Sequence, residues 1–540
     1  MSVLEVRLAG SRSVLVELSS LNSVLALASL LEASPLPGQL DVLAAAGTLF
    51  VKADCPANAQ NIAATIKTLE LGQAPRDTGS LIKVPVYYDG EDLAEVATLT
   101  GLSVQGVINA HTEQMWRAAF GGFAPGFAYL LGENQLLNVP RRSTPRKVVP
   151  TGAVALAGDY SAIYPRQSPG GWQLIGHTDT VLWDLARENP ALIRPQDRVQ
   201  FVPSRASLTL SEPGTTAATA TETGGLAATG IAQLEILDPG LQSLIQDTGR
   251  PGLGNLGVSS AGSADTRSAA QANRLVGNPG THAVIENLTG SLRLRAHGDT
   301  VLAVSGATAN LHIDPVDGDE FHTEREVLMD VPFALLDGEE LTLSPDGNSL
   351  RSYLAVRGGI NVPQVLGSRS TDSMSGIGPA PLRAGALLPV GEIHGAHVVG
   401  NPEPSSLPVP DADGVYTLRI TSGPRADWFD AKSIARLTEQ TWLVSSDTNR
   451  VGVRLALDEG AEALERARTG ELVSEGVAVG SLQVPPSGLP VLFLADHPVT
   501  GGYPVIGVVI DEDLPAAAQL PPGARLRFTQ LTPSVEGTPA

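Results

Sequence analysis

The sequence predicts a mainly β protein in which a small α+β region comes first. In support, 57 glycines and 40 prolines break the 540 residues into short apolar runs, few of which repeat with a helical period. Short strands between turn signals are typical of sandwiches and barrels. At about 150 residues per domain, the length predicts three or four domains.

The α+β region begins with a predicted hairpin. Apolar residues alternate over 4–8 and 14–18, on either side of Gly10 and Ser11, which is the period of a half-buried strand pair. Four further elements follow in the prediction, a helix, a strand pair, a second helix and a strand, at 24–31, 40–52, 59–69 and 81–88. Mixed elements at this spacing favour a small α+β domain.

The remainder of the chain is predicted to consist mostly of strands. A helical stretch at 93–111 precedes short apolar runs over 115–203 and 234–530, in which 268–275 and 430–437 are the better helical candidates. Residues 204–233 are rich in Ala, Thr and Gly without an apolar period, which predicts a flexible linker. The predicted segments are a small α+β domain, a β domain, the linker and two further β domains, at 1–90, 91–203, 204–233, 234–400 and 401–540.

Charge and cysteine content narrow the function classes. The net charge is −21, of which −3 falls within 1–203, and so acidic a chain is a poor partner for nucleic acid or an anionic membrane surface. The single cysteine, Cys55, argues against a disulfide framework or a cysteine-rich metal centre, and no metal site is predicted. Neither a signal peptide nor a transmembrane run is recognisable, so a cytoplasmic location is expected.

Three common catalytic motifs do not occur in the sequence. No Gly is followed by Lys, which rules out a Walker-type phosphate loop, and neither GxSxG nor HExxH is present. Any chemistry is therefore expected from residues scattered over loops.

Three segments of the first half are candidates for such a site. Aromatic residues flank a Pro-Gly turn at 123–130, either as core packing or as the lining of a groove. Four cations crowd 140–150 and could hold a carboxylate or phosphate, or could simply form a solvated loop. At 164–178, Ser-Pro-Gly-Gly could form an anion nest beside Arg166, with His177 either an acid/base or a structural residue.

The second half offers polar turns rather than a compact motif. The longest runs from Asp496 to Pro504 between predicted strands at 491–495 and 505–510. A loop with several hydrogen-bonding side chains on a rigid hairpin suits a binding site, although a plain solvated turn fits equally well.

These segments carry a resemblance to a known family. The first half resembles the B subunit of bacterial ATP-dependent 5-oxoprolinase, a group also described as kinase-inhibitor or allophanate-hydrolase-subunit-1-like, over 123–130, 140–150, 154–158 and 163–178. The second half resembles the C subunit of that enzyme over 246–250, 272–278, 353–371, 418–429 and 475–510. Both parts are also similar to the carboxyltransferase region of urea carboxylase.

The resemblance implies a fold and an activity. We expect cyclophilin-like β-barrel domains, the first of them preceded by the small α+β domain. The implied reaction is ATP-dependent opening of 5-oxo-L-proline to L-glutamate, shared with the separate A subunit of 5-oxoprolinase, which could hold ATP and Mg²⁺. The chain could also form a homo-oligomer. One departure is that 376–382 is shorter than the family's glycine-rich stretch and lacks its Gly-Arg pair.

Site roles follow from the resemblance as a hypothesis. The catalytic residues would be His177, as the group that moves protons, together with Glu475 and Asp496. Substrate and anion contacts in a cleft between the two halves would come from Arg146, Arg166, Glu286, Arg369, Gln483, Thr500 and Tyr503. Arg146 and Arg166 would neutralise anionic groups.

Two other readings stay open. One is a carboxyltransferase-like protein of the urea carboxylase and allophanate hydrolase group, for which other chains would be needed, because this sequence has no Met-Lys-Met biotin site and no amidase signature. We therefore expect no biotin attached to this chain. The other is a non-catalytic module of the histidine-kinase-inhibitor type.

Overall fold

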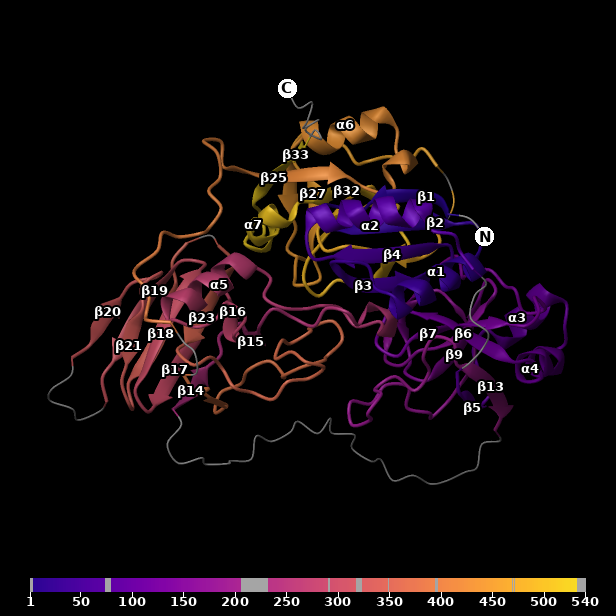
Figure 1. Ribbon diagram of the computed structural model, residues 1–540, viewed down its shortest axis with the longest axis horizontal. Coiled ribbons are helices and arrows are strands. Elements are labelled where there is room, and N and C mark those ends of the chain that lie inside the picture. Colours follow the sequence, from indigo (N-terminus) through magenta and orange to yellow (C-terminus); the bar gives the residue numbers. More distant parts are fainter. Residues whose placement is uncertain are drawn as a thin grey trace.

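The computed structural model describes residues 3–72, 79–204, 232–289, 292–316, 323–347, 349–393, 397–468, 470 and 472–531. Strands dominate, as the sequence predicts, and the described chain forms four bodies (Figure 1). The predicted linker lies outside the described residues except at its ends.

The first body is the α+β domain. Its antiparallel sheet has the order β1 (Val3–Leu8), β2 (Ser13–Leu18), β4 (Thr48–Ala53), β3 (Gln39–Ala44). Helices α1 (Leu21–Ala33) and α2 (Pro56–Thr68) cover one face, so the predicted hairpin and both helices are confirmed. Because side chains alternate along a strand, Val14 and Val16 face the helices while Leu15 contributes to a cluster with Val499 of the last body.

The second body is a seven-stranded sheet that closes on itself. Its order is β12 (Gln173–His177), β9 (Ala153–Ala157), β10 (Tyr160–Ile163), β7 (Ala128–Gly132), β6 (Trp116–Gly121), β13 (Arg198–Pro203), β5 (Leu81–Val86). Tyr87 and His177 exchange two backbone hydrogen bonds of 2.8 and 2.9 Å, which join the chain just after β5 to the end of β12. A small sheet of β8 (Arg146–Val149) and β11 (Ser168–Gly170) lies beside this barrel.

The structure differs from the predicted elements of this region in two respects. The predicted helical stretch at 93–111 is two helices, α3 (Leu93–Thr100) and α4 (Val104–Thr112), because Gly101 ends the first with φ +71° and Ser103 caps the second. Strand β5 pairs in parallel with β13, so the barrel's sheet begins at Leu81 rather than after the predicted boundary at 90.

The third body is a sandwich of two sheets. One has the order β20 (Arg325–Val327), β19 (Ala309–Asp314), β22 (Glu340–Pro345), β17 (Leu292–His297), β14 (Gln233–Asp238), β24 (Leu387–Pro389). The other has the order β15 (Gln242–Gln246), β16 (Val284–Leu288), β23 (Arg351–Val356), β18 (Thr300–Gly306), β21 (Phe333–Leu335). Aliphatic side chains of both sheets form one core, and helix α5 (Thr266–Leu275) packs on the outer face of the second sheet.

The fourth body is a closed barrel. Its order is β25 (Val415–Ser422), β32 (Val505–Val509), β29 (Ser481–Gln483), β30 (Val491–Phe493), β27 (Gly452–Leu457), β26 (Trp442–Val444), β33 (Arg525–Gln530). A small sheet of β28 (Glu475–Gly476) and β31 (Thr500–Gly501) accompanies it, together with helices α6 (Ala431–Glu439) and α7 (Leu514–Ala518). Short 3₁₀ turns lie at η1 (Gly254–Leu256), η2 (Ala426–Trp428) and η3 (Asp511–Asp513).

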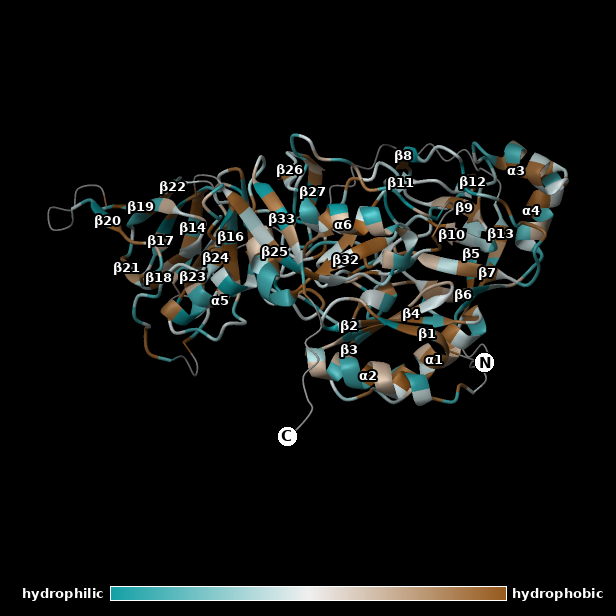
Figure 2. Ribbon diagram, turned by 90° about the horizontal axis from the view of Figure 1, so that it is seen from above, coloured by the Kyte–Doolittle hydropathy of each residue, from teal (hydrophilic) through white to brown (hydrophobic). Residues whose placement is uncertain are grey.

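The last barrel lies at the centre of the molecule. Seen from above, it stands between the sandwich and the first barrel, with the α+β domain along one side and hydrophobic residues concentrated on the strands (Figure 2). Hydrogen bonds tie it to each neighbour: Ser11 to Asp511, Phe123 to Thr500, and Arg450 to Glu286. The two halves of the sequence are therefore interlocked rather than simply joined end to end.

Candidate functional site

A cleft of about 520 Å³ lies between the two barrels. The first barrel contributes residues around 123–129, 141–145 and 169–172, and the last barrel contributes residues around 466–474, 483–486 and 498–503. Three of the predicted contact residues, Gln483, Thr500 and Tyr503, lie on its wall. The aromatic, basic and glycine-rich segments that the sequence analysis selected in the first half also meet there.

Three arginines give the cleft a positive character. Arg141, Arg142 and Arg466 line it, and its described lining residues include no Asp or Glu. Arg141 is exposed and makes no hydrogen bond or ion pair to a described residue. The Nε atoms of Arg142 and Arg466 are buried without a hydrogen-bond partner in the described structure, so these guanidinium groups retain unused donors.

Aromatic side chains form much of the remaining wall. Phe123, Phe127, Tyr129, Tyr164 and Trp172 lie at the cleft and contact one another in edge-to-face geometry. Burial raises the pKa values of the Tyr129 and Tyr164 hydroxyls, although Arg141 acts in the opposite direction on both. Both phenols therefore stay protonated at neutral pH and can donate a hydrogen bond.

Loops from the two barrels meet directly at the cleft. The backbone N–H of Phe123 donates to Thr500 Oγ1 at 3.0 Å, and Phe123 has φ +62°, a region that non-glycine residues rarely adopt. Gln483 Nε2 donates to the Tyr503 carbonyl at 3.1 Å. The Arg466 guanidinium lies 5.5 Å from the Tyr503 ring centroid and donates to the carbonyl of Val484. The bond between Phe123 and Thr500 joins the two walls, and the other contacts order the wall that the last barrel contributes.

The basic segment is anchored from behind by one carboxylate. Asp92 is buried and accepts from Arg142 at 2.5 Å, from Arg146 at 2.8 Å and from the N–H of Leu174 at 2.7 Å. Burial alone would raise the pKa of Asp92, but the bonds from Arg146 and Leu174 and the two positive charges outweigh it and lower the pKa. Arg146, predicted to neutralise an anion, is thus paired with Asp92 and Glu91 and is not among the residues that line the cleft.

The other first-half predictions also find structural partners. His177 is about half exposed, with Nδ1 2.8 Å from Asp89 and its ring stacked on Tyr87, and it does not line the cleft. The Arg166 guanidinium donates to the carbonyl of Met374 and so ties the first barrel to the sandwich. His177 therefore lies outside the group of residues that form the cleft with the three arginines.

Glu475 belongs to a buried ion-pair chain. Arg425 donates to both oxygens of Glu475, at 3.2 and 2.9 Å from Nε and 2.6 Å from Nη2, and also to Glu17 of the α+β domain. Burial raises the pKa of Glu475, which Arg425 partly offsets. This arrangement joins two bodies and leaves Glu475 behind the cleft wall rather than on it.

Asp496 and Glu286 share the buried cation Arg450, and Glu286 also lies 3.5 Å from the buried guanidinium of Arg351. Arg450 donates to Asp496 at 2.9 Å from both Nε and Nη2, and to Glu286 at 2.5 Å from Nη1. Glu286 also accepts from the Tyr353 hydroxyl and Asp496 from Ser373. The cluster clamps the sandwich to the last barrel. Arg369 lies on the sandwich, where it donates to Asn361 and Val362.

The structure thus brings three predicted residues together and places seven elsewhere. The cleft arginines Arg141 and Arg142 belong to the basic segment that the sequence analysis considered for holding a carboxylate or phosphate, although neither is among the predicted site residues. Arg466 carried no signal, because it lies with Arg468 in a stretch of mixed charge that also holds several glutamates. Its position opposite the first barrel depends on the packing of bodies that are distant in sequence.

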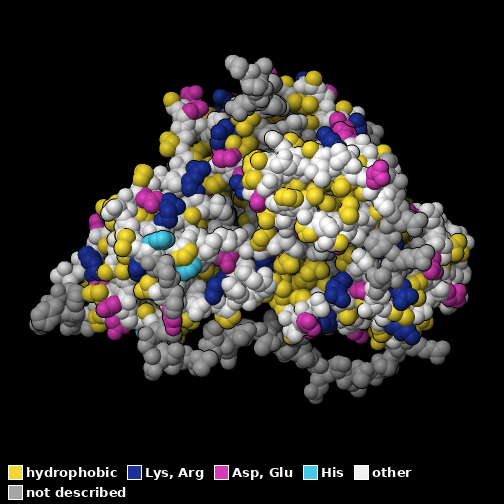
Figure 3. Space-filling model, in the orientation of Figure 1, with side chains coloured by type: hydrophobic (Ala, Val, Ile, Leu, Met, Phe, Trp, Pro, Cys, Tyr) yellow, Lys and Arg dark blue, Asp and Glu magenta, His cyan; other side chains and the backbone are white. Residues whose placement is uncertain are grey.

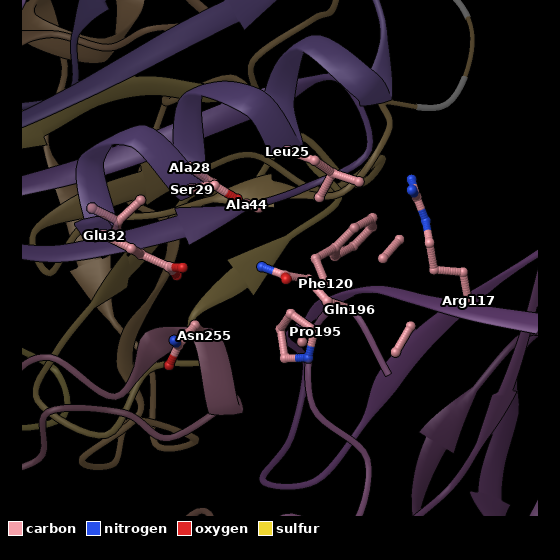
Figure 4. A pocket seen from close by; sticks show the side chains of 14 residues that line it. Leu25, Ala28, Ser29, Glu32, Ala44, Arg117, Phe120, Pro195, Gln196 and Asn255 are labelled. Carbon is pink, nitrogen blue, oxygen red and sulfur yellow. The ribbon is translucent and has the colours of Figure 1, made fainter. Parts of the chain in front are cut away.

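Other features of the surface are less suited to a substrate. A junction of the α+β domain, the first barrel and Asn255 encloses only about 40 Å³, with Glu32 pointing into it (Figure 4). On the face that Figure 3 shows, acidic and basic side chains are interspersed. Among the described residues, the half-buried His312 and Asp314 and the exposed Glu324 form one group with metal-ligating atoms. No described helix is both long and apolar enough to cross a membrane.

Comparisons with known proteins agree with this architecture. The family model described as carboxyltransferase domain, subdomains A and B, matches residues 256–530, and that for subdomains C and D matches 4–193. The structure of the protein TTHA0988 is 33% identical and superposes with a TM-score of 0.80, covering 96% of this chain and 99% of that one.

Curated relatives come from two enzyme groups. The C subunit of 5-oxoprolinase from Escherichia coli strain K12 is 33% identical over 306 residues, which are 55% of this chain and 91% of the relative. The B subunit of 5-oxoprolinase from Escherichia coli O157:H7 is 44% identical over 139 residues, 25% of this chain and 64% of the relative. Urea amidolyase of Saccharomyces cerevisiae is 31% identical over 323 residues, 55% of this chain but only 17% of its own length. The chain belongs to the carboxyltransferase-domain family, as a fusion of parts homologous to the B and C subunits of 5-oxoprolinase.

Proposed function

We propose that this chain is the fused B and C component of an ATP-dependent 5-oxoprolinase and that the inter-barrel cleft binds 5-oxo-L-proline. One observation carries the assignment of the site: three arginines, two with buried and unpartnered Nε donors, line an aromatic cleft whose described lining residues include no carboxylate. The substrate is a small planar lactam with one carboxylate. Cationic and aromatic walls complement those two parts.

The cleft residues have distinct tasks in this proposal. Arg141 and Arg466 approach from opposite walls and hold the substrate carboxylate, while the aromatic side chains pack against the ring. Because Gln483 Nε2 is engaged by Tyr503, its carbonyl oxygen can accept the lactam N–H. Ring opening adds water oxygen to the lactam carbon, breaks the C–N bond and leaves the nitrogen as the amine of L-glutamate. The protonated Tyr129 or Tyr164 hydroxyl would donate to the carbonyl oxygen.

ATP is assigned to a separate protein, the A subunit of 5-oxoprolinase. A Mg²⁺ ion that accompanies ATP prefers carboxylate ligands, and the described lining of the cleft has none. The residues present therefore do not fit Mg²⁺–ATP, and we derive no step through it in this chain. Homology to the B and C subunits supports the need for the third one, and the single cysteine supports a cytoplasmic site of action.

The second candidate is a carboxyltransferase-like reaction on urea. The matched family models and the urea amidolyase relative favour it. A carboxylated donor and a urea-type acceptor could use the same arginines. Substrate choice therefore separates the two functions.

The test combines the full chain with the separate ATP-binding partner, ATP and either 5-oxo-L-proline or urea, and measures glutamate and ADP. We expect glutamate only with the first substrate. Arg141→Met and Arg466→Met should each raise KM about 10- to 100-fold, the loss of one charge-assisted contact, and weaken 5-oxo-L-proline binding to the chain alone in calorimetry. Arg527→Met, an exposed change on β33, is the matched control. Absence of glutamate above the single-protein background would refute the proposal.

A further inference from the structure

A second cavity, of about 300 Å³, lies behind the cleft wall. Three bodies enclose it: residues of β2 to β4 of the α+β domain, the chain around 248–260 before α5, and residues 477–479 and 497–511 of the last barrel. Its lining differs from that of the cleft, because it combines two acids, two cations and a histidine with aliphatic side chains. Neither the proposed reaction nor the ion-pair chains described above use it.

Lys52 is the group in this cavity whose bonding is incomplete. It lies on β4, which is held between β2 and β3, so its position is fixed by two ladders. Its ammonium makes no hydrogen bond to a described residue and has no described carboxylate within 4.0 Å. Burial lowers the pKa of Lys52, although the charges of Asp41 and Asp511 act against that. Lys52 is partly exposed and lines the cavity, so the three donors of its ammonium can take acceptors from a molecule that enters.

The acids nearby are already engaged. Asp511 accepts from Ser11 at 2.5 Å and pairs with Arg12 at 3.0 Å. Asp41 accepts from the N–H groups of Val42 and Gly254 at 2.9 and 3.2 Å. Their charges reach Lys52, but their hydrogen bonds go elsewhere. An acceptor supplied by a ligand would complete the bonding of Lys52.

His497 supplies a neutral acceptor in the same cavity. Its Nδ1 lies 2.8 Å from the carbonyl of Pro498, so that nitrogen carries the proton and Nε2 keeps its lone pair. Its ring stacks on Phe493 at 5.6 Å, and burial lowers its pKa to about 4. A ligand N–H could therefore donate to Nε2. Lys52 and His497 are close enough to influence each other electrostatically.

The remaining lining residues determine that the main part of the ligand should be apolar. Aliphatic and aromatic side chains from all three bodies cover it: Leu43, Phe50, Val258, Val477, Val499 and Val508. Most of these are buried members of two clusters, one that packs the α+β domain on the last barrel and one within the last barrel. A ligand with an apolar body would extend those clusters, whereas a strongly hydrated one would not.

We propose that this cavity is a second ligand site, which takes a small carboxylate with an apolar body and an N–H group. The carboxylate pairs with the Lys52 ammonium and the N–H donates to His497 Nε2. An apolar amino acid and the cyclic amide 5-oxo-L-proline both belong to this class. The site is separate from the cleft and does not depend on the reaction proposed for it.

The cavity and the cleft share one wall. In the extended segment 497–500, His497 and Val499 line the cavity while Pro498 and Thr500 line the cleft. Thr500 also accepts the Phe123 N–H that joins the barrels. A ligand in the cavity would therefore contact the same segment, 497–500, that forms part of the cleft wall.

Calorimetry on the full chain tests the proposal, with L-valine, 5-oxo-L-proline and butyrate as probes. In an Arg141→Met background, which weakens the cleft, L-valine or 5-oxo-L-proline should still bind. Adding Lys52→Met should weaken that binding about 10- to 100-fold, as expected for a charged hydrogen bond, while the exposed control Lys83→Met on β5 should change it less than about twofold. Butyrate, which has no N–H, should bind more weakly than L-valine.

Equal affinity with and without Lys52, or no binding of any probe in the Arg141→Met background, would overturn the site. Equal affinity for butyrate and L-valine would overturn the role of His497. Should Lys52→Met fail to fold, wild-type crystals soaked in L-selenomethionine give a second readout. An anomalous selenium peak in the cavity beside Lys52 supports the site, and its absence there refutes it. These binding and soaking experiments do not depend on the 5-oxoprolinase assay, so they test the second site even if that assay shows no activity.

Discussion

The two barrels have the same topology but use it differently. Numbered along the chain within each barrel, the strands run 1-6-4-5-3-2-7 in both, closed by the parallel pairs β5–β13 and β25–β33. Each has a helix followed by a buried tryptophan whose Nε1 donates to the carbonyl five residues earlier, Trp116 to His111 and Trp442 to Leu437. Even the small accessory sheets correspond, β8–β11 and β28–β31.

The two barrels differ in one of the loops that connect their strands. Pro169-Gly-Gly-Trp172 and Thr500-Gly-Gly-Tyr503 occupy matching positions, and both line the cleft. The loop after the second strand diverges: in the first barrel it brings Phe123 and Phe127 to the cleft, whereas in the last barrel it carries Arg450 to the sandwich. At this loop, one scaffold therefore presents a wall of the cleft on one copy and a domain clamp on the other.

The largest expected effect comes from breaking that clamp. Arg450→Met leaves Asp496 buried without its ion-pair partner and Glu286 with only the more distant Arg351. This should cost about 3–5 kcal/mol in the free energy of unfolding, measured by urea denaturation. Arg454→Met, an exposed change on β27, is the control. A loss below about 1 kcal/mol would show that the last barrel's loop is not a clamp.

The anchor of the first barrel's basic segment should give a pH signature. The folded pKa of Asp92 is lowered, so its stabilisation is present above the unfolded pKa of about 3.9 and is lost as pH falls through the folded pKa. Asp92→Asn should lower stability at pH 7 by about 2–4 kcal/mol and flatten the fall below pH 4. Thermal unfolding against pH measures both, with the exposed Asp179→Asn as the control. An unchanged slope would contradict the assignment.

A smaller effect is expected at the contact between the barrels. Thr500→Val removes the acceptor of the Phe123 N–H and should cost about 1 kcal/mol. Hydrogen exchange at Phe123 should accelerate, while Thr417→Val, on an exposed position of β25, should not affect it. Unchanged exchange would mean that the contact does not hold the loops together.

The smallest effect is expected at His177. Its backbone closes the first barrel, but its side chain is half exposed beside Asp89. His177→Ala should leave kcat/KM within about twofold of the wild type in the coupled assay, as for an ordinary surface change. A loss of tenfold or more in kcat/KM, with an intact fold, would indicate that His177 is a catalytic residue.

Local pattern was sufficient for the elements of the α+β domain, since alternation and helical period at 4–69 are local properties of the chain. It was also sufficient to select 123–130, 140–150, 164–178 and 496–504, because a Pro-Gly turn between aromatic residues, a run of four cations and two Gly-Gly turns stand out in any context. Pattern alone could not show that Arg146 is paired with a carboxylate whereas Arg141 lines the cleft. They lie in one basic run, and Asp92, far earlier in the chain, decides which of them is engaged.

What the sequence by itself determined is the class of fold, the two-part organisation and the segments in which the cleft residues lie, because these depend on periodicity and composition. Only the tertiary structure decided that Glu475, Asp496 and Glu286 are buried partners of arginines, and that Arg466 and Arg141, from different barrels, line one cleft. The physical reason is that a carboxylate's role depends on what lies within a few ångströms of it, and for Glu286 that neighbour, Arg450, is 164 residues away along the chain.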